Sequence, residues 1–132
     1  MGAVGYLLDT HTFLWSVREC KKLSNKARKI IEDVDNPLYV SSASAYEIMN
    51  KHRIGKLPGF EYEAEYFFDI LHTLGANELS INMKHAHLAG KIDWAHRDPF
   101  DRLLAAQAHI EKLTLVTNDS VFQTFPSITL LW

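Results

Sequence analysis

Val4-Gly5-Tyr6-Leu7-Leu8-Asp9 is a short apolar run that ends directly in a carboxylate. Similar runs of four or five residues recur along the chain, at 38–42, 79–82, 113–117 and 128–131. Continuous apolar runs of this length are typical of strands that are buried on both faces of a parallel sheet. We therefore expect a strand at 4–8 and one at each of the later runs.

Helical patterns fill the intervals between these runs. Ser24 is an expected N-cap, and Ser42 or Ser44 is expected to open a helix that ends near Gly55. A further helix is expected over Tyr62–Leu74, with its stop at Gly75, and Asp98-Pro99 is expected to begin a helix through Ala108. Alternating strands and helices predict an α/β fold, with helices covering both faces of a parallel sheet. At 132 residues, the chain is expected to form one domain over 1–132.

Four carboxylates lie just past the predicted strands or at the start of a helix: Asp9, Glu47, Asp101 and Asp119. The carboxyl ends of parallel strands line one edge of an open sheet, where ligands bind. Two like charges about 4 Å apart repel by roughly 4 kcal/mol at an effective dielectric near 20, so clustered acids require raised pKa values or a bound cation. Oxygen ligands of this kind favour Mg²⁺ or Mn²⁺.

Composition limits the class of protein. The chain is 47% hydrophobic and 23% charged, as in folded globular proteins and unlike disordered ones. Its single cysteine, Cys20, excludes an internal disulfide and a zinc site built on cysteines. No apolar run approaches the ~18 residues of a membrane span. We expect a soluble, cytoplasmic protein with no membrane association.

The chain resembles the PIN-domain nucleases, and among them the VapC-type toxins of bacterial toxin-antitoxin pairs. The resemblance rests on four segments in order: Leu7-Leu8-Asp9-Thr10-His11, Ser44-Ala45-Tyr46-Glu47-Ile48 with Lys51 to Leu57, His96 to Ala106, and Leu115-Val116-Thr117-Asn118-Asp119. It implies a three-layer PIN-like domain with a five-stranded parallel sheet, a Mg²⁺ or Mn²⁺ site and endonucleolytic cleavage of RNA. It also implies a cognate antitoxin and a homodimer.

The resemblance assigns roles to particular residues. The family's acidic positions fall on Asp9, Glu47, Asp101 and Asp119, and its hydroxyl position near the last acid falls on Thr117. Thr117 and Asn118 are then expected to orient the carboxylates. Asp98 is expected to be the N-cap of the helix that carries Asp101, because Pro99 suits the first helical position.

Each acid also has a purely structural interpretation. Asp9 and Asp98 are plausible N-caps, Ser44-x-x-Glu47 fits a capping box, and Asp119 could close a turn. These interpretations explain the acids singly, but they do not explain why all four fall at one edge of the expected sheet. Only the metal site accounts for that joint placement.

Basic residues follow two of the acids. Lys51 lies four residues after Glu47 and Arg102 lies directly after Asp101, so both are candidate phosphate contacts for an RNA substrate. The alternative to an enzyme is a catalytically silent PIN-like module that binds RNA or a protein partner. Zinc is disfavoured, because His85-x-His87 does not place both rings on one helix face.

Overall fold

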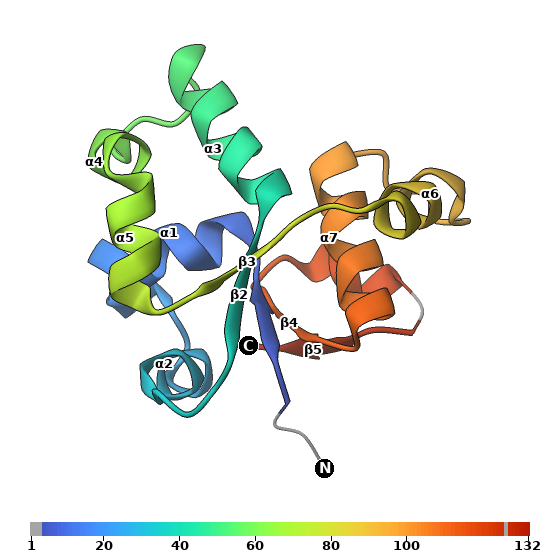
Figure 1. The fold of residues 1–132 in the computed structure, drawn as a ribbon, viewed down its shortest axis with the longest axis horizontal. Coiled ribbons are helices and arrows are strands. Elements are labelled where there is room, and N and C mark those ends of the chain that lie inside the picture. Colours follow the sequence, from blue (N-terminus) through green and yellow to red (C-terminus); the bar gives the residue numbers. More distant parts are fainter. Residues whose placement is uncertain (1–3, 126) are drawn as a thin grey trace.

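A five-stranded, fully parallel sheet with the strand order β3-β2-β1-β4-β5 forms the centre of the molecule (Figure 1). The computed structural model describes residues 4–125 and 127–132. The strands are β1 Tyr6–Leu8, β2 Leu38–Ser41, β3 Asn77–Leu79, β4 Thr114–Val116 and β5 Thr129–Leu131. The expected α/β fold with a five-stranded parallel sheet is confirmed.

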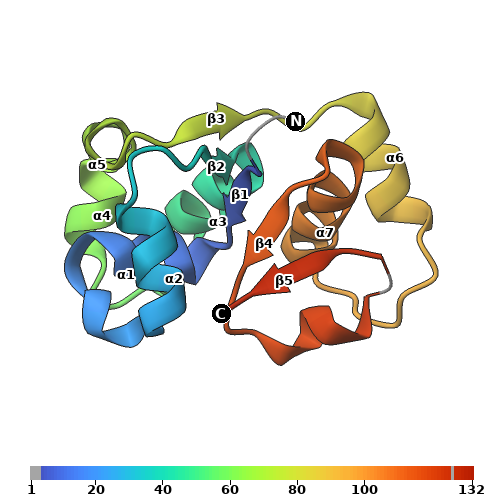
Figure 2. The same cartoon turned by 90° about the horizontal axis from the view of Figure 1, so that it is seen from below.

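Helices flank the sheet on both sides, as Figure 2 shows. They are α1 Thr10–Arg18, α2 Asn25–Glu32, α3 Ser42–Arg53, α4 Glu61–Glu65, α5 Phe67–Leu74, α6 Met83–Lys91 and α7 Pro99–Glu111, with short 3-10 turns at Cys20–Lys22 and Ser120–Thr124. In both views α1, α2, α4 and α5 lie together on one side, and α6 and α7 lie on the other. None of the helices in the described part of the chain has the length and apolar character needed to cross a membrane.

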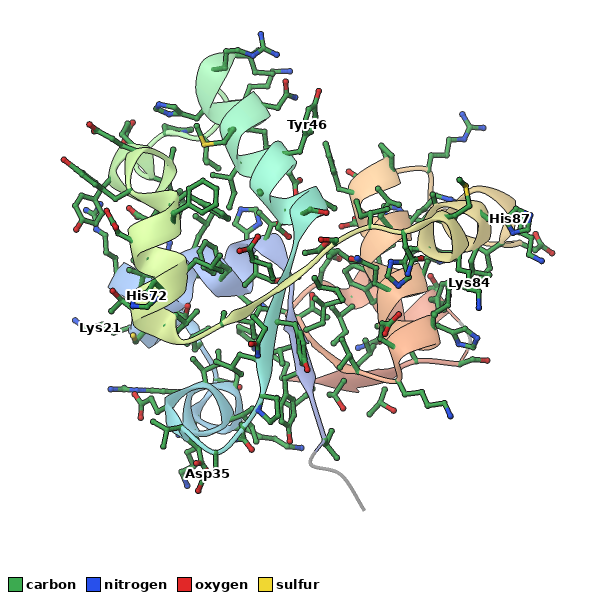
Figure 3. All side chains as sticks on the ribbon, viewed as in Figure 1. Lys21, Asp35, Tyr46, His72, Lys84 and His87 are labelled. Carbon is green, nitrogen blue, oxygen red and sulfur yellow. The ribbon has the colours of Figure 1, made fainter. Side chains whose placement is uncertain are left out.

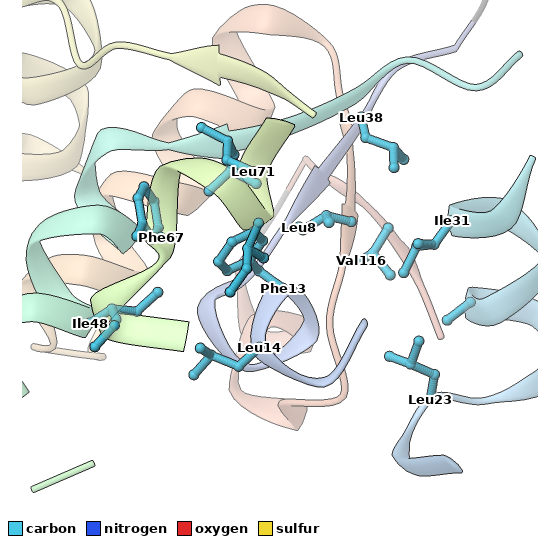
Figure 4. Packing of buried hydrophobic residues seen from close by; sticks show 14 of the residues in the cluster. Leu8, Phe13, Leu14, Leu23, Ile31, Leu38, Ile48, Phe67, Leu71 and Val116 are labelled. Atoms are coloured by element: carbon cyan, nitrogen blue, oxygen red, sulfur yellow. The ribbon is translucent and has the colours of Figure 1, made fainter. Parts of the chain in front are cut away.

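Successive residues of the central strands point to opposite faces and supply two separate cores. Leu8 and Val116 pack with Phe13 and Ile31 on the side of α1 and α2 (Figure 4). Leu7 and Leu115 pack with Trp94 and Leu104 on the side of α7. This two-sided burial is the reason that the central strands appear in the sequence as unbroken apolar runs.

Several predicted boundaries are confirmed. Ser24 caps α2 by accepting a hydrogen bond from the Ala27 backbone N–H, Gly75 ends α5 in the left-handed conformation, and Asp98 caps α7. The helix after β2 ends next to Gly55, whose φ of 74° is also left-handed. These signals are local, so they can be recognised without knowledge of the fold.

Other boundaries differ from expectation. The helix expected to open at Ser42 or Ser44 does begin at Ser42, but its N-cap is the preceding residue, Ser41, whose hydroxyl accepts from Ala43 N–H. The helix expected over Tyr62–Leu74 is divided at Tyr66 into α4 and α5. The third strand is Asn77–Leu79 and not 79–82, because this edge strand is mostly exposed and therefore carries no apolar run.

The sheet order places a topological switch point between β1 and β4. From β1 the chain moves outward to β2 and β3, whereas β4 and β5 lie on the other side of β1. The crevice outside the carboxyl ends of two such strands is where open α/β sheets bind ligands. Asp9 follows β1 and Thr117 follows β4, so both lie at this crevice.

Candidate active site

Asp9 lies at the junction of β1 and α1 and is nearly buried, at 9% exposure. Its Oδ1 accepts from the Thr12 backbone N–H at 2.8 Å, which makes it the N-cap of α1. Its Oδ2 accepts from the Thr117 hydroxyl at 2.5 Å. Burial raises the pKa of Asp9, and these hydrogen bonds offset only part of that effect. Asp9 is thus both the predicted cap and a buried acid at the crevice.

Glu47 projects from the middle of α3 and is 7% exposed. Its Oε1 accepts from the Thr10 hydroxyl at 2.6 Å, and its Oε2 pairs with the Lys51 ammonium at 2.6 Å. The capping-box interpretation is wrong, because Ser44 lies inside α3 and the cap is Ser41. Glu47 is therefore free of a helix-capping role.

Asp101 belongs to the first turn of α7, and its Oδ2 lies 2.7 Å from His96 Nε2. Burial raises the pKa of Asp101 to about 6, and the negative charges of Asp98 and Asp119 act in the same direction. The hydrogen bond from His96 opposes this shift. Asp98, Asp101 and Asp119 thus lie at one end of α7 and the adjoining turn, where two carboxylates act on Asp101.

Asp98 and Asp119 both combine a capping role with a place beside the cleft. Asp98 Oδ1 accepts from the backbone N–H groups of Phe100 at 2.9 Å and Asp101 at 3.1 Å. Asp119 Oδ1 accepts from Val121 N–H at 3.0 Å. The Thr117 hydroxyl accepts from Asp119 N–H at 3.0 Å while it donates to Asp9, so it joins the two segments as a bridge.

One cleft of about 400 Å³ brings these residues together, a volume within the ~300–1,000 Å³ usual for ligand sites. Its lining consists of Asp9, Thr10, His11, Trp15, Glu47, Lys51, Asp98, Asp101, Asn118 and Asp119. All four predicted acids are present, with Asp98, Asn118 and Lys51. The joint placement that the sequence pattern implied is thus seen in the folded chain.

The cleft offers the hard oxygen donors that Mg²⁺ and Mn²⁺ prefer. Within residues 4–125 and 127–132, no three His, Cys, Asp or Glu side chains converge tightly enough to form a ready-made cage. Each carboxylate is held instead by a threonine, a lysine, a histidine or a backbone N–H. Mg²⁺ generally keeps several waters and binds through one or two carboxylates, so a spread set of acids fits this ion.

Arg102 is not among the residues that line the cleft. Its Nε donates to Ala89 O, its Nη1 to Trp94 O and His96 O, and its Nη2 to Ile92 O, all at 2.7–2.9 Å. These four bonds tie the loop between α6 and α7 to the start of α7. The guanidinium is occupied by the protein's own backbone, so we assign Arg102 to positioning this loop and not to substrate contact.

Sequence reasoning missed four residues of the site. Thr10, His11 and Trp15 line the cleft, and His96 contacts Asp101. Thr10 and His11 could have been found, since they directly follow Asp9 at the strand end. His96 and Trp15 carry no comparable local signal, because their places depend on the folding of the 92–97 loop and of α1.

Comparison with known proteins agrees with this architecture. The PIN domain family profile matches residues 6–127, and the chain belongs to this family. Over 65 residues it is 43% identical to Ribonuclease VapC16 of Mycobacterium tuberculosis (strain ATCC 25618 / H37Rv), a match that covers 49% of this chain and 45% of that protein. The chain thus aligns with less than half the length of this relative.

Solved structures share the fold at low sequence identity. The chain is similar to VapBC2 from Rickettsia felis bound to a promoter DNA fragment, with a TM-score of 0.71, 19% identity and 96% of both chains covered. It is also similar to DNA-bound VapBC from Salmonella typhimurium, with a TM-score of 0.72, 17% identity and 97% of both chains covered. At these identities the likeness establishes the fold alone.

Proposed function

We propose that this chain is a Mg²⁺- or Mn²⁺-dependent endoribonuclease, acting as the toxin of a toxin-antitoxin pair. The observation that carries the proposal is the cleft at the β1/β4 switch point, which Asp9, Glu47, Asp101 and Asp119 all line. Its family membership and the partial match to a relative named as a ribonuclease support the same assignment. A cytoplasmic location follows from the proposed RNA substrate.

The bound metal would supply Lewis-acid activation of water and stabilise the charge on the leaving 3′ oxygen. Asp9, Glu47, Asp101 and Asp119 would hold it, directly or through water. Burial raises the pKa values of Asp9 and Asp101, so both carboxyl groups bind protons more readily than free ones, and protons would compete with a cation for them. The products would carry 5′-phosphate and 3′-hydroxyl ends.

Residues around the acids prepare the site. Thr117 fixes the Asp9 carboxylate and links it to the segment of Asp119, while His96 fixes the Asp101 carboxylate. Lys51 neutralises Glu47 in the metal-free cleft. Glu47 would help to hold the metal, and the Lys51 ammonium beside it would contact a substrate phosphate. Asn118 faces the same cleft and would help to orient its ligands.

The direct test is cleavage of single-stranded RNA by the purified protein with Mg²⁺, with Mn²⁺ and with EDTA. Cleavage is expected only with metal, and the metal should also raise the melting temperature by binding the native state. Equal cleavage in EDTA would refute the mechanism. Metal binding without any cleavage would instead support the second candidate, a catalytically silent PIN-like module.

The partner proposal rests on the fold that the chain shares with toxin-antitoxin complexes. The chain has a TM-score of 0.66 to a toxin-antitoxin complex from Klebsiella pneumoniae. Expression of the chain alone should slow growth, and co-expression of its cognate antitoxin should relieve the effect. A homodimer is expected, and light scattering after size-exclusion chromatography would measure it. Unimpaired growth at confirmed expression levels would contradict the toxin assignment.

A further inference from the structure

An aromatic ledge borders the acid cleft on the side of α1. We define it as His11, Trp15 and Trp132. The His11 and Trp15 rings lie 5.6 Å apart at 49°, and both line the cleft. The Trp15 and Trp132 rings lie 6.0 Å apart at 62°. The ledge thus begins two residues after Asp9 and reaches Trp132, which follows β5.

Core packing accounts for only part of this arrangement, because Trp15 and Trp132 pack against the core whereas His11 is not among the core residues. His11 is exposed, so its ring contributes little to the core. The Asp9 carboxylate is held by Thr12 N–H and by Thr117, so it needs no partner from His11. Trp15 packs partly against the core beside Phe13, and the rest of its side chain forms a wall of the cleft. An exposed imidazole resting on an indole at the edge of a polar cleft is a surface suited to a flat ligand.

The ledge also connects two hollows. Asn118 and Asp119 line both the acid cleft and an adjacent hollow whose wall includes Gln123 and Trp132. Trp15 belongs to the first hollow, and its contact with Trp132 bridges to the second. A chain-like ligand whose phosphate lies at the acids would therefore pass its neighbouring unit along these rings.

We propose that the aromatic ledge is a nucleobase subsite, in which the base next to the scissile phosphate stacks on the His11 ring with Trp15 behind it. This inference rests on the proposed ribonuclease function and adds the residues that would hold a base of the substrate. Bases of single-stranded nucleic acids stack on aromatic side chains regardless of their sequence. A paired base is not free to do so, and the ledge would therefore select loops and single strands.

The salt dependence of RNA binding distinguishes stacking on the ledge from contacts to phosphates. Phosphate contacts by Lys or Arg release counterions, so their loss lowers the slope of log affinity against log salt. Stacking releases no counterions, so loss of the ledge should weaken binding and leave that slope unchanged. Lys51 lines the same cleft and provides the opposite case, in which removal of the ammonium should change the slope.

The test measures the affinity of a short single-stranded RNA by fluorescence anisotropy at several salt concentrations. Ca²⁺ replaces Mg²⁺, and a gel checks that the RNA stays intact. The same RNA is prepared with an abasic riboside at each position in turn. His11→Ala removes the ring, His11→Phe keeps an aromatic face, and His72→Ala on α5 is the control, because His72 is an exposed histidine outside the cleft (Figure 3).

One abasic position should weaken binding to the wild type by about 5- to 100-fold, the usual range for one stacked base. His11→Ala should weaken binding of intact RNA by a similar factor and be insensitive to the abasic change at that position. His11→Phe and His72→Ala should behave like the wild type, and Trp15→Phe should keep most of the affinity. The salt slope should be the same for all of these proteins.

Two results would overturn the inference. The first is a loss of affinity in His11→Ala that is equally large for intact RNA and for every abasic RNA, because the ring would then contact the RNA backbone and not a base. The other is a His11→Phe protein as weak as His11→Ala. If the wild type cuts RNA and the ledge variants match it on every substrate, only the subsite fails. If the wild type neither binds nor cuts RNA with metal, the proposed function itself fails.

Discussion

Asp101 and Arg102 are neighbours on α7, yet their side chains belong to two differently built regions. Arg102 donates to four backbone carbonyls of the 89–96 segment, which are fixed in place. Asp101 faces the cleft, where its partner is the side chain of His96. Glu47 likewise depends on the side chains of Thr10 and Lys51, and Asp9 Oδ2 depends on that of Thr117, although Asp9 Oδ1 also caps α1.

This difference in bonding partners distinguishes the structural role of Arg102 from the role of the acids in the cleft. A buried charge that is satisfied by backbone groups cannot exchange its partners without unfolding the segment. A buried charge held by side chains can exchange them, because a rotamer change is enough to free the carboxylate for another ligand. The raised pKa values of Asp9 and Asp101 show that their present partners do not fully compensate for burial. The cleft is therefore the region prepared to bind a cation.

The largest effect should come from Asp9→Asn, which keeps the shape of the side chain and removes its charge. RNA cleavage should fall by more than about 100-fold, beyond the 10–100-fold typical of residues that only support metal ligands. The melting temperature without metal should not fall, since a neutral amide removes a buried charge. Asp35→Asn at an exposed site is the control. Near-normal cleavage by Asp9→Asn would reduce Asp9 to a helix cap.

Arg102→Met tests the scaffold. It should lower the free energy of unfolding by about 3 kcal/mol, because hydrogen bonds to charged groups contribute ~1.5–3 kcal/mol each and buried carbonyls would be left unpaired. Arg102→Lys keeps the charge but not the forked geometry, and should lose most of the same stability. Urea unfolding measures both, with Arg97→Met at an exposed position as the control. If Arg102→Lys has the same free energy of unfolding as the wild type, the positive charge alone is sufficient to hold the loop.

Acidification should stabilise the metal-free protein through Asp101. The native Asp101 carboxyl has a pKa of about 6, against 3.8 for an ordinary aspartate, so between these pH values the native state binds the extra proton. Stability from this group therefore rises as the pH falls from 7 toward 4. The gain is at most about 3 kcal/mol, at 1.36 kcal/mol per pKa unit.

The comparison that isolates this effect is wild type against Asp101→Asn, unfolded in urea at each pH with EDTA present. The difference in stability between the two proteins should change in favour of the wild type as the pH falls. A pH-independent difference would show that Asp101 is not perturbed in the native state. Added Mg²⁺ should reverse the trend for the wild type, because the ion requires the ionised carboxylate.

Asp98 should give the smallest effect. Asp98→Ala should cost about 1 kcal/mol of stability, since the α7 N-cap is lost. Asp98→Ser should restore the cap, because its hydroxyl can also accept from the first turn, and should keep most of the cleavage activity. If the Asp98→Ser protein is folded but as inactive as Asp101→Asn, Asp98 belongs among the metal ligands.

Much of the fold could be predicted from local patterns. The central strands were recognisable because both of their faces are buried, and Leu7, Leu8, Leu115 and Val116 have to be apolar for that reason. Edge strand β3 was misplaced because its residues are mostly exposed. The break at Tyr66 was also missed, since neither Gly nor Pro marks it in the sequence.

The sequence by itself determined the strand-helix alternation, the acids at the strand ends and the caps at Ser24, Gly75 and Asp98, since these depend on near neighbours along the chain. Only the tertiary structure decided the partners of distant side chains. It assigned the Thr10 hydroxyl to Glu47, the Thr117 hydroxyl to Asp9, the Arg102 guanidinium to the loop before α7, and Trp15 to the wall of the cleft. Such partners depend on the packing of α1, α3 and α7 around the switch point, which no local pattern contains.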